Sequence, residues 1–227
     1  MRSHQRQIAA CLMAASFFLG SPLPAHAHPH VFVSATMTVS ATPEGDLLAV
    51  HNSWWMDELF SSSVVVDFDE NANGRLDPEE LSAVGKQVGT SIKEWSYYTF
   101  VRQGAGDVAL AAPAALDVVF DAKRGQLQFS FQMKPEKPLR LKGQTTTFSN
   151  FDDTYFVAFD FAETGAFVTK DLPSGCKSGE SAPSPDEAAK SWMATIAGLG
   201  PGDTVPEDGI KFSEVLSTKF TLDCSKD

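Results

Sequence analysis

Residues 31–40 read Val-Phe-Val-Ser-Ala-Thr-Met-Thr-Val-Ser, with an apolar side chain at every odd-numbered position. This period of two predicts a half-buried β-strand, because successive side chains of a strand point to opposite faces. The following Pro43–Asp46 has the composition of a turn, and residues 47–53 are predicted to return as the second strand of a hairpin. The folded part of the chain is therefore expected to begin with a β-hairpin.

Helical patterns follow the hairpin, and strand patterns then return. Residues 56–66 form the first predicted helix, and Leu81, Val84, Val88 and Ile92 recur at the spacing of a second, amphipathic helix. Further strands are predicted at 97–102, 116–120, 127–132, 145–149, 155–161 and 166–170. The fold class expected from this order is α+β: an antiparallel β-sheet or sandwich with an inserted helix–loop–helix.

The two ends of the chain have distinct compositions. Residues 1–27 combine a cationic start, an apolar run of about a dozen residues and an Ala-His-Ala sequence, which together predict a cleaved signal peptide. Residues 28–172 are expected to form the core domain. Residues 173–227 are expected to form a C-terminal appendage, with a linker at 175–185 and a helix that starts at Ser184 and stops at Gly198.

The segment between the two predicted helices, residues 69–80, matches every position of an EF-hand calcium loop. Side-chain oxygens occur at positions 1, 3, 5, 9 and 12, a glycine, Gly74, occupies position 6, and position 7 offers a main-chain carbonyl. Pro78 is expected to begin the second helix, with position 9 as its N-cap. The predicted calcium ligands are Asp69, Asn71, Asn73, Arg75, Asp77 and Glu80.

Two features of this loop favour a structural role for calcium. Asn71 and Asn73 leave only three carboxylates in the site, and lower ligand charge generally weakens calcium affinity. A second loop of the same pattern is missing, since residues around Asp208 fail at position 3 and in the spacing to Glu214. We therefore expect a lone site that clamps two helices to the sheet.

The cysteine count and the net charge are typical of an exported protein. Loss of residues 1–27 leaves two cysteines, Cys176 and Cys224, for which a disulfide is favoured and a pair of metal thiolates is the alternative. It also removes two arginines and no acid, so the net charge falls from −11 to −13. This charge disfavours nucleic acid and anionic membranes as partners. The mature chain has no apolar run long enough to span a membrane.

Three histidines remain after the predicted cleavage: His28, His30 and His51. As the first residue, His28 would offer both its amine and its ring nitrogen to one metal ion. His30 lies on the same face one strand repeat later, and His51 lies on the neighbouring predicted strand, where it could approach them. Such a donor set suits Zn²⁺, Ni²⁺, Co²⁺ or Cu²⁺. The alternative is three ordinary polar residues, two of them at a frayed terminus.

The chain resembles a bacterial periplasmic family, domain-of-unknown-function family 1007, over residues 27–170. The resemblance rests on the segments 28–33, 51–54, 57–61, 67–80, 98–101 and 153–157. Proteins of this kind are described as periplasmic components of an ABC-type transport system and occur beside nickel/cobalt or zinc permeases. The resemblance implies a periplasmic location, an inner-membrane metal permease as partner, and a metal site at the three histidines.

The leading functional hypothesis is therefore a non-enzymatic, metal-binding accessory of transition-metal transport. One alternative is a copper-dependent redox enzyme with a histidine brace at His28, and another is a calcium-stabilised structural module. Hydrolase signatures such as Gly-x-Ser-x-Gly and His-Glu-x-x-His do not occur. The Asp152-Asp153 doublet is more typical of a turn or cap than of paired catalytic acids.

Overall fold

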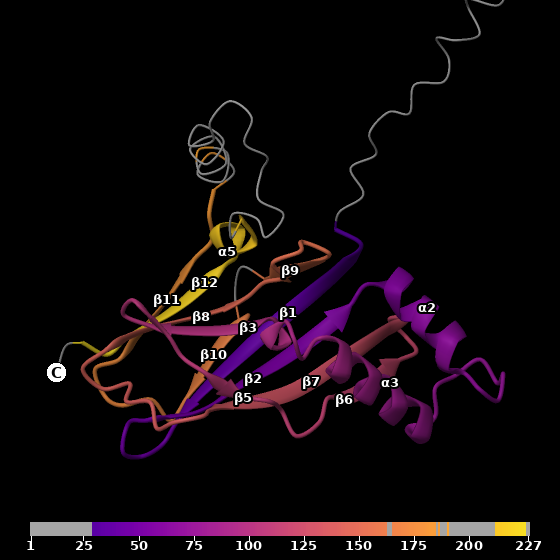
Figure 1. The fold of residues 1–227 in the computed structure, drawn as a ribbon, viewed down its shortest axis with the longest axis horizontal. Coiled ribbons are helices and arrows are strands. Elements are labelled where there is room, and N and C mark those ends of the chain that lie inside the picture. The colour runs from indigo at the N-terminus through magenta and orange to yellow at the C-terminus, as the bar shows by residue number, and fades with distance from the viewer. Residues whose placement is uncertain (1–28, 163–164, 185, 187–189, 191–211, 226–227) are drawn as a thin grey trace, which may run out of the picture.

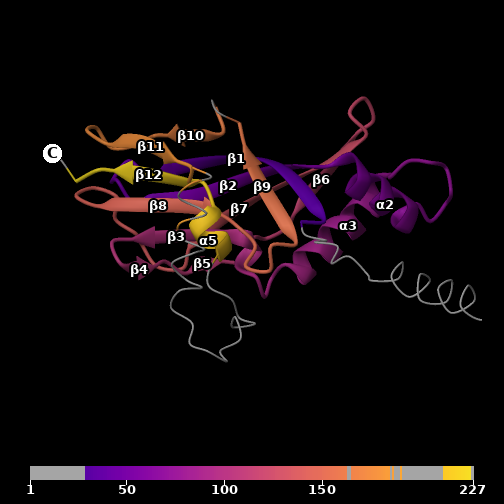
Figure 2. The same cartoon turned by 90° about the horizontal axis from the view of Figure 1, so that it is seen from above.

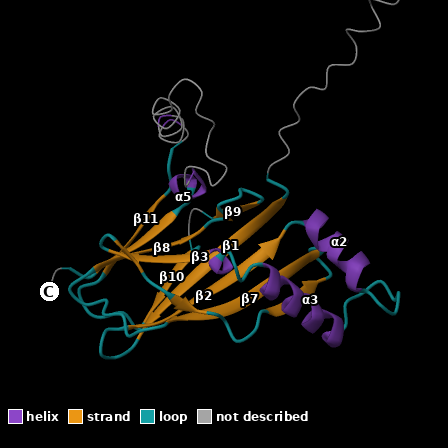
Figure 3. Cartoon of the chain, viewed as in Figure 1, coloured by secondary structure: helices purple, strands orange, loops and turns teal. Residues whose placement is uncertain are grey.

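A computed structural model describes residues 29–225 except 163–164, 185, 187–189 and 191–211. The predicted signal peptide, His28 and most of the helix expected after Ser184 lie outside the described residues. The described chain folds into two β-sheets, with two longer helices at one end (Figures 1 and 3). No helix within the described ranges has the length and apolar character needed to cross a membrane.

The larger sheet is built around the predicted hairpin. β1 (Val31–Ala41) pairs antiparallel with β2 (Leu47–Met56), and its side chains alternate between buried and more exposed positions as expected. β7 (Gln126–Pro135) lies on the other side of β2, and β5 (Leu110–Ala111) and β6 (Asp117–Asp121) pair with β7. On its other edge, β1 pairs with β9 (Val157–Phe161) and β10 (Phe167–Lys170).

The pairing of β1 with β9 and β10 is parallel, which corrects the expectation of a purely antiparallel sheet. The second sheet is antiparallel throughout, in the order β11–β12–β8–β3–β4. Its strands are Lys177–Ser181 (β11), Lys219–Asp223 (β12), Thr145–Asn150 (β8), Thr99–Gln103 (β3) and Gly106–Asp107 (β4).

The two sheets pack face to face at one end of the molecule (Figure 2). Met37 and Val39 from β1 share a buried cluster with Phe148, Phe220 and Leu222 from the second sheet. This arrangement confirms the predicted sandwich, because apolar faces of both sheets are removed from water in one core.

Helices cover the larger sheet where the second sheet ends. α2 (Glu58–Phe68) and α3 (Pro78–Ser91) contribute Val64 and Val84 to a second core that includes Trp54 and Phe129 of the sheet. A short 3₁₀ turn, η2 (Ser96–Tyr98), leads from α3 towards β3. The helix–loop–helix predicted between the hairpin and the later strands is therefore present, with the first helix starting two residues later than expected.

The expected C-terminal helical appendage is wrong for the described part of that segment. β11 lies inside the predicted linker, and β12 is inserted between β8 and β11 in the second sheet. Besides these strands, a short helix, α5 (Phe212–Leu216), precedes β12. Phe220 and Leu222 alternate with polar residues and enter the core, a period-two pattern too short to stand out in the sequence. The Cys176–Cys224 disulfide is confirmed, and it joins the ends of β11 and β12.

Candidate functional site

Side-chain oxygens of the predicted calcium loop accept hydrogen bonds from the loop's own backbone N–H groups. The Asp69 carboxylate accepts hydrogen bonds from the N–H groups of Asn73 and Gly74, at 3.0 and 2.7 Å. Asn71 Oδ1 accepts from the N–H of Asn73, and Asn73 Oδ1 accepts from that of Arg75. Gly74 has a φ of +78°, a conformation that glycine adopts without a steric penalty. The oxygens at positions 1, 3 and 5 thus line the inner side of a tight turn.

The end of the loop is closed by the start of α3. Asp77 caps the helix as predicted, and its N–H donates a hydrogen bond to the Glu80 carboxylate at 2.9 Å, which completes a capping box. The other carboxylate oxygen of Glu80 accepts from the Glu70 N–H at 3.0 Å. Glu80 is only 8% exposed, so this acid holds the first and last turns of the loop together from a buried position.

One contact must change before a cation can occupy this loop. Asn71 Nδ2 donates to Asp77 Oδ2 at 3.0 Å and to Glu80 Oε1 at 3.3 Å, so a nitrogen stands where calcium would require an oxygen. Rotation of the Asn71 amide would exchange the two atoms. Among the described residues, no three His, Cys, Asp or Glu side chains gather closely enough to hold a metal by themselves. The donor chemistry fits calcium, with two asparagines and a main-chain carbonyl completing the set.

The histidines are separated by the strand register. His30 lies directly before β1 and is exposed, and its ring centroid is 4.9 Å from that of Phe156. His51 in β2 stands opposite Thr38 of β1, eight residues further along the strand, which corresponds to roughly 26 Å at the rise of a β-strand. The expected approach of His51 to His30 therefore does not occur. His28, the remaining member of the predicted site, lies outside the described residues.

His51 has a different environment on the open face of the larger sheet. Its neighbours across the strands are Thr38 and Gln132. Partial burial lowers the pKa of the His51 ring, the charge of Lys170 lowers it further, and Asp117 opposes both effects. His51 is thus favoured in its neutral form, in which a ring nitrogen keeps its lone pair, but His30 does not lie near it in the register.

A turn at residues 152–157 positions the start of β1. The buried Asp152 accepts hydrogen bonds from the N–H and hydroxyl of Thr154 and from the N–H of Val157, all at 2.8–2.9 Å. The carbonyl of Phe156 in turn accepts from the N–H groups of His30 and Val31. Asp152 is therefore a turn-organising residue, as the doublet suggested, and through this turn it places His30.

Beneath this turn lies a buried polar network that no sequence pattern indicated. Thr99 Oγ1 accepts from Asn52 Nδ2 at 3.0 Å and from Asn150 Nδ2 at 3.2 Å, which links the two sheets. The hydroxyl of the neighbouring Tyr98 has a pKa raised to about 12 by burial and by the charges of Asp152 and Glu94. Residues 96–98 have φ values of +49° to +54°, a left-handed turn that is uncommon outside glycine. No sequence pattern predicted this left-handed turn, because tertiary contacts hold it in place.

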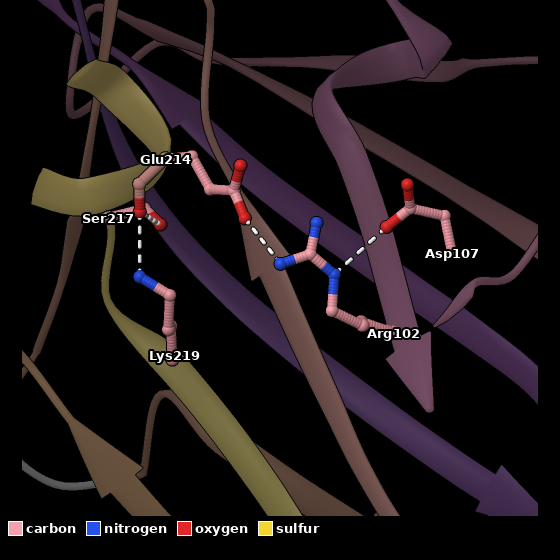
Figure 4. Close-up of polar contacts among 5 residues, drawn as sticks. All are labelled: Arg102, Asp107, Glu214, Ser217 and Lys219. Atoms are coloured by element: carbon pink, nitrogen blue, oxygen red, sulfur yellow. Dashed lines mark hydrogen bonds and ion pairs between the residues drawn. The ribbon is translucent and has the colours of Figure 1, made fainter. Parts of the chain in front are cut away.

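A charged cluster joins α5 to strands β12, β3 and β4 of the second sheet. Arg102 in β3 contacts Asp107 at 2.9 Å and Glu214 of α5 at 2.8 Å, and Lys219 donates to the Glu214 carbonyl at 2.7 Å (Figure 4). The hydrogen bond to Asp107 and the charge of Glu214 raise the pKa of Arg102, whereas burial lowers that of Lys219. The cluster borders a groove of 620 Å³ whose wall includes the stacked rings of Phe100 and Phe151. The guanidinium is already matched by two carboxylates, so the cluster ties α5 to the sheet.

Comparison with known proteins identifies one family whose model matches this chain. The model of a protein family of unknown function, DUF1007, matches residues 13–224. The chain belongs to this family. An uncharacterised protein of Haemophilus influenzae is 23% identical over 170 residues, which is 75% of this chain and 80% of that protein. An uncharacterised 15.5 kDa protein of Spirochaeta aurantia is 28% identical over 113 residues, 49% of this chain and 78% of that protein.

Membership of the DUF1007 family extends to the C-terminal strand. The match ends at Cys224, so it includes β11, β12 and the disulfide, which the expected resemblance over residues 27–170 left out. This agrees with the structure, in which β12 completes the second sheet.

Proposed function

We propose that this DUF1007 protein is a non-enzymatic, metal-binding accessory of a divalent transition-metal transport system, active in the periplasm and braced by calcium. The observation that carries the metal-binding part is the 69–80 loop, in which Asp69, Asn73, Asp77 and Glu80 direct oxygens around one turn and Asn71 would do so once its amide is rotated. The extracytoplasmic location is supported by the Cys176–Cys224 disulfide, because such bonds persist in oxidising compartments.

The calcium role is structural in this proposal. The loop joins α2 to α3, and its Leu76 is buried in the core beneath both helices. An ion that binds the folded loop and not the unfolded chain stabilises the fold by mass action. Calcium would therefore hold α2 and α3 on the larger sheet.

Calcium at about 1 mM should raise the free energy of unfolding by roughly 0.4–1.4 kcal/mol, if the affinity is about 10⁻⁴–10⁻³ M as in extracellular modules. Glu80→Gln should abolish this gain, because glutamine keeps the capping-box hydrogen bond but loses the bidentate charge. Urea unfolding with and without calcium measures the effect. Glu79→Gln is the control, since the exposed Glu79 occupies a non-ligand position of the loop. A wild-type protein indifferent to calcium, or equal losses in both variants, would contradict the proposal.

The transition-metal site is proposed at the processed N-terminus. His28 would supply its amine and ring, and His30, whose ring is seated against Phe156, would supply a third nitrogen. His51 is left out of the revised ligand set because of the strand register. The metal would then be carried at the exposed end of β1, where a permease could receive it.

Zinc titration by calorimetry should separate these ligands. In protein that begins at His28, we expect one Zn²⁺ site that weakens at least about tenfold when a glycine precedes His28 or when His30 is changed to Gln, a loss of about 1.4 kcal/mol or more. His51→Gln should leave the affinity within about twofold. An affinity lost with His51 but kept with the N-terminal extension would overturn the proposed site. Redox turnover with Cu²⁺ would favour the copper-enzyme alternative instead.

A further inference from the structure

Two apolar residues of the first helix of the helix–loop–helix face solvent. Leu59 and Val66 are each 80% exposed, whereas the buried positions of α2 are Ser61 and Val64. Phe60, Val65 and Phe68 of α2 pack against the core with Val64, so Leu59 and Val66 form apolar surface outside the usual buried stripe of a surface helix. Leu59 and Val66 are seven residues apart and so lie on one face, separated by about two turns. We call this face, with Ser62 and Ser63 between its two ends, the α2 stripe.

The outward position of Leu59 and Val66 is fixed by specific contacts of α2. The Ser61 hydroxyl donates to the Asp57 carbonyl at 2.7 Å and accepts from the Leu127 N–H of β7 at 2.9 Å. Asp57 caps α2 through the Phe60 N–H, and it accepts from the Phe32 N–H of β1 at 2.8 Å. These bonds set the rotation of α2 about its axis, so Leu59 and Val66 cannot turn inward while the bonds persist.

The charges around the stripe have one sign. Glu58 precedes Leu59, Asp67 follows Val66, and Glu70 lies just beyond the end of the helix, all three exposed. The sequence contains no lysine or arginine from residue 7 to residue 74. Arg124, in the turn between β6 and β7, lies 4.5 Å over the Trp55 ring on the sheet and is engaged there. An apolar face with acidic residues at both ends matches a partner with apolar side chains and cationic flanks.

We propose that the α2 stripe is a docking surface for a basic amphipathic helix of a partner protein. Helix-on-helix contact fits the spacing of the two apolar side chains, and the acidic ends would attract and orient a cationic partner. Phe32 of β1, 57% exposed, is hydrogen-bonded through its backbone to Asp57, so β1 begins beside the N-cap of α2. Figures 1 and 2 both show the start of β1 beside α2. The small area predicts a weak, transient contact. This inference does not depend on the metal sites.

Fluorescence anisotropy with two labelled synthetic peptides tests the proposal. One is an amphipathic helix of leucine and lysine, about 14 residues long, and the other has glutamate in place of every lysine. The full mature protein should bind the lysine peptide at least about tenfold more tightly than the glutamate peptide, and salt should weaken this binding. The double variant Leu59→Ser/Val66→Ser should bind the lysine peptide at least about tenfold more weakly.

The matched control is Leu48→Ser/Val119→Ser, which removes two exposed apolar side chains elsewhere, 46% and 53% exposed. The control should bind within about twofold of wild type, and unfolding curves should show that both double variants remain folded. Equal affinity for the two peptides, or equal losses in the two double variants, would overturn the proposal. Adsorption to phosphatidylcholine/phosphatidylglycerol vesicles that depends on Leu59 and Val66, with no peptide preference, would replace it with a membrane surface. Dimerisation lost only in the stripe variant would replace it with a second copy of the chain.

Discussion

Replacement of Phe220 by alanine should lower the free energy of unfolding by about 3–5 kcal/mol, the range for a fully buried aromatic side chain. Phe220 is 0% exposed. Its ring stacks on that of Phe167 with centroids 4.6 Å apart and meets the edge of Phe161 at 4.9 Å. These partners lie in β10 and β9 of the other sheet, so the side chain fills the space between the two sheets. Alanine would leave a cavity that both rigid sheets could close only in part.

Urea unfolding of the oxidised protein measures this loss, with Val215→Ala as the control. Val215 lies in α5 of the same C-terminal segment but is 36% exposed, so its truncation should cost less than about 1 kcal/mol. If β12 were part of a separate appendage, Phe220→Ala would leave the main transition unchanged. A small effect at both positions would therefore contradict the integral role assigned to β12.

Replacement of Gly85 by alanine should lower the free energy of unfolding, because it overpacks the contact between α3 and the sheet. A Cβ at Gly85 would come within 2.4 Å of the Leu116 main-chain oxygen and 3.1 Å of Val118 Cγ2. The segment that carries these atoms leads into β6, and a carbonyl cannot rotate away as a side-chain tip can. Forcing α3 away from it should cost about 3 kcal/mol, and the better helix propensity of alanine returns about 1 kcal/mol. We expect a net loss of about 2 kcal/mol.

Gly89 provides the matched comparison one turn later in α3. Its added Cβ would meet the flexible Leu116 Cδ1 at 3.3 Å, a contact that a small rotation relieves. Gly89→Ala should therefore be neutral or stabilising by up to about 1 kcal/mol. The urea midpoint should fall for Gly85→Ala and should stay the same or rise for Gly89→Ala. A Gly85→Ala variant as stable as wild type would show that the helix does not approach the sheet as closely as described.

Local signals in the sequence predicted the parts of the fold that depend on neighbours in the chain. The alternation from Val31 to Ser40 requires only the pleat of a strand, and β1 follows it. Asp77, Pro78 and Glu80 carry their own capping chemistry, so the start of α3 was correct to the residue. The even count of mature cysteines led to the observed disulfide because only one pairing was possible.

The register and the pairing of strands that are far apart in the chain could not be predicted from the sequence. The register of β1 with β2 separates His51 from His30, and a pairing register is not written in the alternation itself, since every shift by two residues preserves the buried face. The parallel contacts of β1 with β9 and β10, and the insertion of β12 beside β8, join segments more than 60 residues apart. Their energy comes from shared burial, which exists only once both sheets are assembled.

By itself, the sequence determined the hairpin, the helix–loop–helix with its ordered oxygen ligands, and the disulfide, because each follows from residues that are close in the chain or have a single possible partner. The tertiary structure alone decided that His51 lies far from His30, that the C-terminal strand belongs to the core, and that Leu59 and Val66 face outward. These three outcomes depend on how far one strand slides along another and how one helix is rotated by Ser61 and Asp57. Such quantities are fixed by contacts between distant segments, and no local pattern of residues specifies them.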